Sequence, residues 1–540
     1  MSDAAPMKWW GWGAPDRRLE LGAQARAMLA DELGTAEPAA RVELDAVRLP
    51  AARELPDAVA RAAGEVRTDH EDRVRHTAGK SYPDLFRARS GEPAGAPDAV
   101  LAPESAPQAA AVIDACSSAG VAVVPFGGGT SVVGGVDPVA GPHGAVVSLD
   151  LAGLRHCEVD RVSMTARLGP GLRGPEAEAA LAAHGLTLGH YPQSFEYATI
   201  GGFAATRSAG QSSAGYGRFD ELVAAVELAA PAGRMATLRT PHTAAGPALR
   251  ELIVGSEGTL GVITDVAVRV RPAPEVARYE GWVAADFESG AAAVRALAQA
   301  DRLPDVTRLS DAEETRVSLA LSGTSGLKRS LLDSYLRLRR RTGGCMFIVG
   351  WEGEPEDVER RRALSSRALR QSGAVRIGSA PGRAWSHGRF EGPYLRDELL
   401  DLGYFVETLE TSHTWSRYQE LYRAVGDALR EALAAQGTPG LVWCHLSHAY
   451  RDGASLYFTF VAPRKVGAEI EQWRAVKTAA CEAIVATGGT ITHHHAVGRD
   501  HAPYMSAEVG EVGLEALRAL KERLDPAGIM NPGKLLPERD

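Results

Sequence analysis

The stretch that decides the fold is residues 121–131, VAVVPFGGGTS, where an apolar strand signal runs directly into three glycines and two hydroxyl residues. Two further glycine clusters follow, Gly201-Gly202 and the segment GSEGTLG at 255–261. Glycine accounts for 58 of the 540 residues, well above the usual ~7%, and no Gly-X-Y repeat explains the excess. Glycine loops expose backbone N–H groups that can bind phosphate. Three of them in one α/β region predict a long diphosphate ligand lying along the backbone.

These loops match neither of the common nucleotide-binding motifs. The first lacks the lysine of a P-loop, and it is not a G-x-G-x-x-G turn that opens a helix. The net charge of −9 argues against nucleic-acid binding, which requires a basic surface. The five cysteines form no C-x-x-C pair, which excludes a zinc ribbon and a disulfide framework. Because no apolar stretch approaches the ~20 residues of a membrane span or forms a signal-peptide core, a cytoplasmic location is expected.

Composition and turn signals divide the chain into four parts. The first part is rich in Arg, Glu and Ala, and we expect it to be mostly helical. In the second, Pro107 to Gly120 is predicted as a helix, and Val262 to Val270 as a half-buried strand because valine alternates with polar or small residues. The third combines apolar strands with amphipathic helices such as Ser416 to Ala435. The predicted parts are an N-terminal extension (1–95), a ligand-binding domain (96–274), a cap or substrate domain (275–490) and a C-terminal segment returning to the ligand site (491–540).

The three glycine clusters, in this order and spacing, resemble the FAD-binding domain of the vanillyl-alcohol-oxidase flavoprotein superfamily, as does Asn531-Pro532-Gly533-Lys534 near the end. The resemblance implies an α+β fold, with a two-subdomain FAD-binding domain, an α+β cap domain and a helical N-terminal extension. Some members attach the flavin to a histidine in or near these loops. The first two clusters contain none, so we expect FAD to bind non-covalently. The implied cofactor-binding residues are Pro125, Gly127, Gly128, Gly129, Thr130, Ser131, Thr199, Gly201, Gly202, Thr206, Ser208, Glu257, Gly258, Gly261, Ile263 and Thr408.

Within that superfamily, four local features resemble the alkyldihydroxyacetonephosphate synthase family. They are KWWGWG at 8–13, DHEDR at 69–73, DGASLYF at 452–458 and HHHAVG at 493–498, where Ala496 replaces a glycine of the family pattern. The resemblance covers nearly the whole chain. Its most specific part is the triple histidine together with the upstream tyrosine strand.

Tyr457 and the three histidines are also candidates on their own chemistry. Alternation along Ser455 to Val461 puts the large apolar residues on one face and Tyr457 on the other, which suits a cavity wall. Free tyrosine has a pKa of ~10 and needs nearby positive charge or donors to act as a base at neutral pH. His493, His494 and His495 could supply it, and in an extended chain His494 would point away from the other two. The plainer interpretations are an ordinary sheet tyrosine and an exposed polar loop or adventitious metal site.

The substrate-binding arginines come from the resemblance alone, because many arginines could serve. Arg396, in Arg396-Asp397, matches the family's phosphate-contacting arginine, and the planar guanidinium suits that role. Arg308 matches an arginine near the flavin. Thr408 replaces a serine of the family pattern, which retains a hydroxyl there. A solvated surface charge is the plainer interpretation of each arginine.

The resemblance implies an FAD-dependent transferase of ether lipid biosynthesis. It would exchange the acyl group of 1-acyl-dihydroxyacetone phosphate for a long-chain fatty alcohol, through a flavin adduct without net redox change. Tyr457 would act in proton transfer, and the histidines would position groups and stabilise charge. A homodimer and peripheral membrane contact are expected, and neither a nucleic-acid partner nor a metal site is predicted. Two alternatives stay open: an FAD-linked oxidase or dehydrogenase of a 2-hydroxy acid, with the histidines binding metal or carboxylate, and a flavin-free scaffold.

Overall fold

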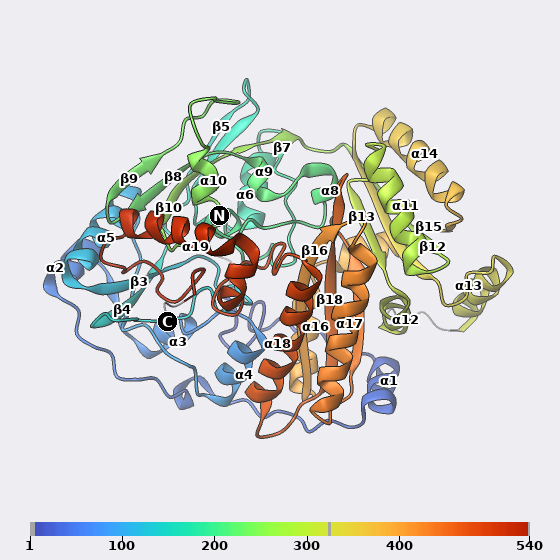
Figure 1. The fold of residues 1–540 in the computed structure, drawn as a ribbon, viewed down its shortest axis with the longest axis horizontal. Helices are drawn as coiled ribbons and strands as arrows, with labels where there is room; N and C mark the ends of the chain where they lie inside the picture. The colour runs from blue at the N-terminus through green and yellow to red at the C-terminus, as the bar shows by residue number, and fades with distance from the viewer. Residues whose placement is uncertain (1–5, 322–325, 538–540) are drawn as a thin grey trace.

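This computed structural model describes residues 6–321 and 326–537 (Figure 1). The first and third glycine clusters adjoin strands of two sheets, one mostly parallel and one antiparallel. The four-stranded sheet has the order β1-β2-β4-β3, in which β2, β4 and β3 run parallel. The five-stranded sheet is antiparallel, with the order β5-β6-β10-β8-β9. The strands are β1 (Val66–Arg67), β2 (Ala99–Leu101), β3 (Val121–Phe126), β4 (Ala145–Asp150), β5 (Cys157–Asp160), β6 (Thr165–Leu168), β8 (Val223–Ala230), β9 (Gly233–Ala236) and β10 (Val262–Arg269).

The predicted helix before the first glycine cluster forms as α5 (Ala106–Ala119). The Ser105 side chain caps its first turn by accepting from the Gln108 N–H, and Gly120 ends it in a left-handed conformation. β3 follows at once and is buried along nearly its whole length. The strand is therefore pinned in the sheet at the point where the glycine loop begins.

The prediction that the strand from Val262 to Val270 is half-buried is wrong. β10 is buried at all but its last residue, because it is an interior strand of its sheet and both of its faces are covered. Val262 packs in one core with residues of α5, and Ile263, Val266 and Val268 pack in another with residues of α7 (Ile200–Ala205). Alternation of valine with small residues therefore did not indicate a solvent face here.

The third sheet has seven antiparallel strands in the order β15-β12-β14-β13-β17-β18-β16. Helices α11, α17 and α18 share one hydrophobic core with it (Figure 1). In α17, Leu421, Val425, Leu429 and Leu433 are fully buried, as the helical spacing predicted. The elements are β12 (Val276–Ala284), β13 (Val306–Ser310), β14 (Cys345–Gly353), β15 (Val375–Gly378), β16 (Tyr404–Thr414), β17 (Leu441–Leu446), β18 (Gly453–Pro463), α11 (Phe287–Gln299), α12 (Ala312–Leu321), α13 (Gly326–Leu338), α14 (Pro355–Gln371), α15 (Ala380–Gly388), α16 (Gly392–Asp401), α17 (Tyr418–Ala435) and α18 (Glu469–Thr487).

The N-terminal extension is less helical than the sequence suggested. Irregular chain containing several prolines separates its short helices, and its strand β1 pairs with β2 of the four-stranded sheet. Trp9 and Trp12 are buried, so this segment packs as part of the molecule. Its helices are α1 (Ala23–Leu33), α2 (Asp57–Ala63), α3 (His70–Arg75) and α4 (Tyr82–Ser90), with a 3₁₀ turn at Leu44–Ala46.

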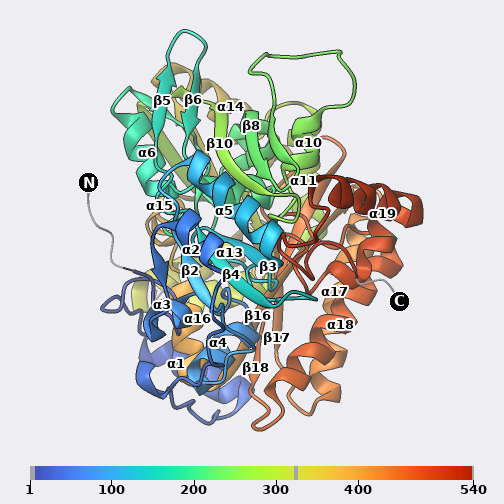
Figure 2. The same ribbon diagram turned by 90° about the vertical axis from the view of Figure 1, so that its left-hand side faces the viewer.

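The C-terminal segment returns to the first sheet. After α19 (Met505–Leu524), which lies at the side of the molecule in Figure 2, Met530 forms a parallel bridge with Val123 of β3. Among the described residues, no helix has both the length and the apolar character needed to cross a bilayer. The remaining elements are α6 (Gly174–Ala182), α8 (Ser213–Tyr216), α9 (Phe219–Leu222), α10 (Leu249–Ile253), the paired strands β7 (Leu186–Thr187) and β11 (Arg271–Pro272), and a 3₁₀ turn at Ala502–Tyr504.

Candidate active site

One cavity of about 520 Å³ lies between the glycine loops and the seven-stranded sheet. This volume is within the range of small-molecule sites. It is lined by every predicted catalytic, substrate-binding and cofactor-binding residue except His493, so segments more than 300 residues apart in the chain share one wall. The structure thus brings the glycine loops, Tyr457, Arg308, Arg396, Thr408, His494 and His495 together.

The first glycine loop presents a run of free backbone donors. Within the described chain, the N–H groups of Gly127 to Ser131 have no hydrogen-bond acceptor. Glycine is required at position 128, since a Cβ there would lie 2.0 Å from the Tyr197 carbonyl oxygen. At Gly129 the backbone adopts φ +63°, and a Cβ would meet the Phe126 ring. A run of unpaired N–H groups at a cavity wall fits a diphosphate, so the residues present fit FAD.

The second glycine cluster forms the start of α7 rather than a loop, and neighbouring hydroxyl groups fix its backbone. Thr199 caps α7 by accepting from the Gly202 N–H, and Thr206 Oγ1 donates to the Gly202 carbonyl. Ser208 Oγ bonds His190 Nε2 at 3.1 Å. Gly201 packs on Pro170, where a Cβ would come within 2.7 Å. These contacts hold α7, whose first turn contains Gly201 and Gly202, against the cavity.

Glu257 of the third cluster holds the C-terminal segment in place. Its two carboxylate oxygens accept the N–H groups of Val497 and Gly498 at 2.8 and 2.7 Å. The Asn531 amide donates to the Glu257 carbonyl at 2.7 Å, which ties the closing turn to the same loop. Burial raises the pKa of Glu257 to about 7. The carboxylate predicted to contact FAD is therefore engaged within the chain, although the residue also lines the cavity.

Tyr457 stands in the middle of the cavity wall, on β18. Its ring stacks between His445 and His494, with centroids 4.8 and 5.9 Å away, and His495 meets it edge-on at 5.4 Å. Burial raises the pKa of Tyr457 to about 12, while a hydrogen bond with Thr408 works in the opposite direction. Burial also lowers the pKa values of His494 and His495, so these rings are neutral. Because burial disfavours the charged form of these rings, the structure does not support the expectation that the histidines supply positive charge to Tyr457.

The triple histidine is wound around one carboxylate rather than extended. Glu410 accepts the N–H groups of His493, His494 and His495 at 2.6, 3.0 and 2.8 Å. This turn places His494 and His495 on the cavity, whereas His493 contacts Tyr450, 2.7 Å from its hydroxyl. The predicted alternation is therefore wrong, because a buried carboxylate gathers three successive N–H groups to one side.

Arg308, on β13, reaches the cavity but its guanidinium is already paired. It donates to Glu314 at 2.6 Å and contacts both ring nitrogens of His445 at 2.9 and 3.0 Å. Despite burial, Arg308 and His445 hold the pKa of Glu314 at about 2. Because Glu314 already neutralises the Arg308 guanidinium, Arg308 is better suited to hold His445 against Tyr457 than to bind a phosphate.

Arg396, on α16, keeps an unused donor. One terminal nitrogen donates to the Lys80 carbonyl at 2.6 Å, but Nε is buried and has no partner within the described chain. Lys80 lines the same cavity, and burial lowers its pKa to about 8. Two cations at one wall, one with an orphaned donor, can bind an anionic group.

Sequence reasoning missed Lys80, His445 and His448, which all line the cavity. The two histidines stand three apart in CHLSH at 444–448, directly before the tyrosine strand, and that spacing was the available signal. It also missed an apolar wall built from α1, α12, α16 and the sheet. The wall consists of Leu21, Met28, Leu29, Val317, Leu321, Leu395, Leu399, Val406 and Trp443.

Two known domain families match the chain, one in each half. Residues 97–239 match the FAD binding domain family, and residues 273–535 match the C-terminal domain of FAD linked oxidases. The fold and the site thus define an FAD-dependent flavoprotein, and FAD is its cofactor. The fold class and the cofactor predicted from the sequence are confirmed. The roles of individual site residues stay predictions.

Similarity to whole proteins identifies the family. The chain is 32% identical over 481 residues to alkyldihydroxyacetonephosphate synthase of Dictyostelium discoideum, covering 88% of this chain and 79% of that one. It is 34% identical over 484 residues to the enzyme of Trypanosoma brucei brucei, with 88% and 78% covered. A solved alkyldihydroxyacetonephosphate synthase structure superposes with a TM-score of 0.84 at 28% identity, covering 98% of this chain and all of that one. The chain belongs to the alkyldihydroxyacetonephosphate synthase family.

A more distant solved structure shares the fold alone. The 4-ethylphenol oxidase from Gulosibacter chungangensis superposes with a TM-score of 0.66 at 14% identity, over 91% of this chain and all of that one. The architecture therefore extends to proteins with little sequence in common.

Proposed function

We propose that this protein forms the ether bond of ether lipids, exchanging the acyl group of 1-acyl-dihydroxyacetone phosphate for a long-chain alcohol. The products are alkyl-dihydroxyacetone phosphate and a free fatty acid, so the exchange needs no net oxidant or reductant. One observation carries the proposal. A single cavity joins phosphate-type glycine loops, an arginine with an unused donor and an apolar wall. When bound, FAD supplies an electron-accepting ring that activates the ketone-bearing fragment.

The phosphate of the substrate goes to Arg396. Its buried Nε has lost water and gained no partner, so an oxyanion in hydrogen-bond reach would recover that lost interaction. Lys80 adds a second cation at the same wall, held by the carbonyls of Lys8 and Trp9 at 3.0 and 3.3 Å. This pair favours a dianionic headgroup over a simple carboxylate, which supports the phosphate substrate.

The Tyr457 hydroxyl is the group that exchanges a proton with the substrate. Its hydrogen bond with Thr408 favours the phenolate, and nearby Arg396 acts in the same direction on its pKa. The neutral imidazole of His495, which meets its ring edge-on, has a lone pair that can accept a proton during the exchange, and His494 stacks on the same ring. Arg308 and Glu314 hold His445 on the opposite face of the same ring. The surrounding groups thus keep the phenol oriented at the cavity wall.

The alkyl chain of the alcohol lies along the apolar wall. Leu29 of α1, Val317 of α12 and Leu399 of α16 come from three helices that face the cavity. An alkyl chain gains about 0.8 kcal/mol for each methylene buried on such a surface. A long alcohol therefore binds far better than a short one, which supports a lipid substrate.

We extend the proposal to cellular context. Leu331, Tyr335 and Leu338 are exposed at helical spacing on α13, the helix that follows α12 of the cavity wall. Such an apolar stripe suits peripheral contact with the membrane that holds the lipid substrates. A cytoplasmic homodimer with non-covalent FAD completes the proposal.

The test is turnover without an electron acceptor. FAD-loaded protein is incubated anaerobically with acyl-dihydroxyacetone phosphate and labelled hexadecanol, and labelled alkyl product is measured. We expect product to form while the flavin spectrum stays oxidised. Substrate-dependent bleaching that an added acceptor reverses would instead indicate an oxidoreductase.

A conservative pair of variants isolates the phenol. Tyr457→Phe is expected to lower turnover by roughly 10²- to 10⁴-fold while FAD stays bound, the range for loss of a proton-transfer group. Tyr404→Phe is the matched control on the neighbouring strand β16. Its hydroxyl donates to the Gly34 carbonyl, and it does not line the cavity. Equal turnover in the Tyr457 variant and the control would refute the assignment.

A further inference from the structure

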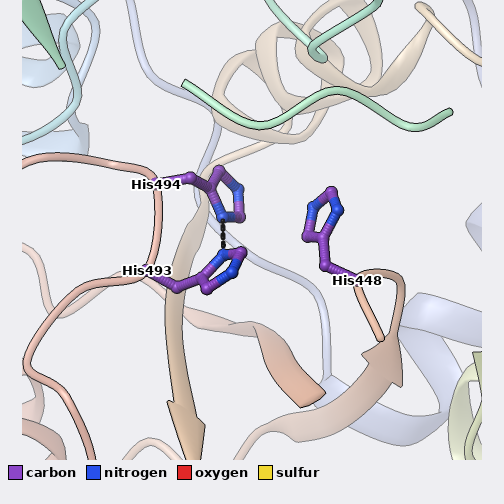
Figure 3. A group of neighbouring side chains, drawn as sticks. All are labelled: His448, His493 and His494. Atoms are coloured by element: carbon purple, nitrogen blue, oxygen red, sulfur yellow. Dashed lines mark hydrogen bonds between the residues drawn. The ribbon is translucent and has the colours of Figure 1, made fainter. Parts of the chain in front are cut away.

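Three imidazoles converge at one side of the cavity, and two of them line it. His448 lies in the loop between β17 and β18, and His493 and His494 lie in the loop after α18 (Figure 3). One ring nitrogen from each lies within 4.8 Å of the others, and the Nδ1 atoms of His493 and His494 are 3.1 Å apart. His448 stacks on His493 with centroids 5.2 Å apart. Three neutral nitrogen ligands at this spacing are the donor set of a transition-metal site.

One of these nitrogens has no partner of its own. His448 Nδ1 is buried and forms no hydrogen bond within the described chain. His493 differs, because its Nε2 lies 2.7 Å from the Tyr450 hydroxyl, which leaves Nδ1 to face the group. A buried nitrogen without a partner costs free energy that a bound cation would recover.

The local charge favours a cation. Glu410 has a fully buried side chain, and one of its oxygens lies 3.4 Å from His494 Nδ1. The nearby cation, Arg218, also hydrogen-bonds Tyr450, and its charge is partly compensated by Asp220 at 3.1 Å. The carboxylate is thus a buried negative charge that neutral rings do not balance.

We propose that His448, His493 and His494 bind one divalent metal ion, Zn²⁺ in preference to Mg²⁺ or Ca²⁺. Imidazole nitrogens suit zinc and other late first-row metals, whereas Mg²⁺ and Ca²⁺ require oxygen ligands. Zn–N bonds of about 2.0–2.1 Å place tetrahedral ligand atoms roughly 3.3 Å apart, close to the His493–His494 separation. A turn of the His448 ring closes the remaining distance.

The surroundings supply the supporting hydrogen bonds that such sites use. Tyr450 can accept from His493 Nε2–H, which fixes the tautomer with Nδ1 free for the metal. Glu410 holds the backbone of both loop histidines. His448 and His494 also line the cavity, so the fourth position is open to water or to a cavity ligand. The site does not depend on ether-bond formation, and metal binding and turnover are measured separately.

The experiment uses tag-free, FAD-loaded protein. The protein is stripped with chelator, titrated with Zn²⁺ against a competing chromophoric chelator, and analysed for zinc by mass spectrometry after desalting. We expect about one ion per chain, and X-ray absorption of the loaded protein should show three imidazole ligands. His448→Gln and His493→Gln should each weaken binding roughly 100-fold or more, since loss of even a supporting contact costs 10–100-fold.

The control is His413→Gln on β16. It removes a histidine from the same region whose nitrogens bond the Thr487 carbonyl and the Thr414 N–H. This variant should bind zinc like the wild type, and the ratio of FAD to protein verifies folding in every variant. Wild-type protein that retains no zinc, a zinc spectrum lacking histidine ligands, or unchanged affinity in a folded His448→Gln protein would each overturn the proposal.

Discussion

Replacing Glu410 by glutamine is expected to loosen the loop that carries the three histidines. One carboxylate oxygen accepts from Thr492 Oγ1 and from the N–H groups of His494 and His495, and the other accepts from the His493 N–H. Glutamine has a single acceptor oxygen and no charge. The best placement of its amide still leaves the His493 N–H facing another donor.

The magnitude follows from these four bonds. A hydrogen bond to a charged group contributes about 1 kcal/mol more than a neutral one, so the three retained bonds lose about 3 kcal/mol together. The orphaned N–H adds roughly 1–3 kcal/mol. Allowing for relaxation, local opening becomes easier by about 3–5 kcal/mol, which corresponds to exchange faster by roughly 10²- to 10⁴-fold.

Hydrogen–deuterium exchange on peptides spanning residues 490–500 measures this directly in the FAD-loaded protein. Glu508→Gln is the control, because Glu508 accepts from Thr490 Oγ1 and the Ile491 N–H of the same loop but is exposed. Its replacement should cost less than about 1 kcal/mol. Exchange in Glu410→Gln within threefold of the wild type would refute the view that this carboxylate organises the loop.

Three further outcomes are expected. Gly128→Ala should lose most of its FAD, measured as flavin absorbance per protein, because the new Cβ meets the Tyr197 carbonyl at 2.0 Å; Gly144→Ala, with no atom within 4 Å, should keep it. Glu257 has a folded-state pKa of about 7, above its unfolded value of about 4.5, so wild-type stability should fall by up to about 3 kcal/mol as pH rises from 4.5 to 7. Glu257→Gln lacks this slope, and a difference in melting temperature between the two proteins that is independent of pH would contradict it. Arg396→Lys, which removes the unpartnered Nε, should raise the KM for acyl-dihydroxyacetone phosphate about tenfold with less effect on the alcohol, and equal effects on both would argue against phosphate binding.

Local sequence predicted correctly those features that depend on backbone conformation alone. The run from Val121 to Ser131 predicted both the buried strand and the loop of free N–H groups, because glycine and strand signals act over a few residues. It was a poor guide to exposure along β10, since the same alternation occurs in a strand covered on both faces. It also overestimated the helix content of the N-terminal extension.

The electrostatic state of the site was beyond local reasoning. The triple histidine was a candidate source of positive charge beside Tyr457, yet burial lowers the pKa of His494 and raises the pKa of the phenol to about 12. The turn around Glu410 could not be foreseen either, because that carboxylate lies on a strand more than 80 residues earlier. Lys80 and part of the apolar wall, namely Leu21, Met28 and Leu29, enter the cavity from the N-terminal extension, where no motif marks them.

Taken by itself, the sequence determined the cofactor-binding backbone, the strand that presents Tyr457 and the identity of the side chains available for chemistry. These depend on local rules of conformation and on residue type. Only the tertiary structure decided which of those side chains meet, which charges are already paired, as at Arg308, and which donor is left free, as at Arg396. The physical reason is desolvation: a group's charge and its need for a partner are set by what excludes water from it, and here those neighbours are distant in the chain.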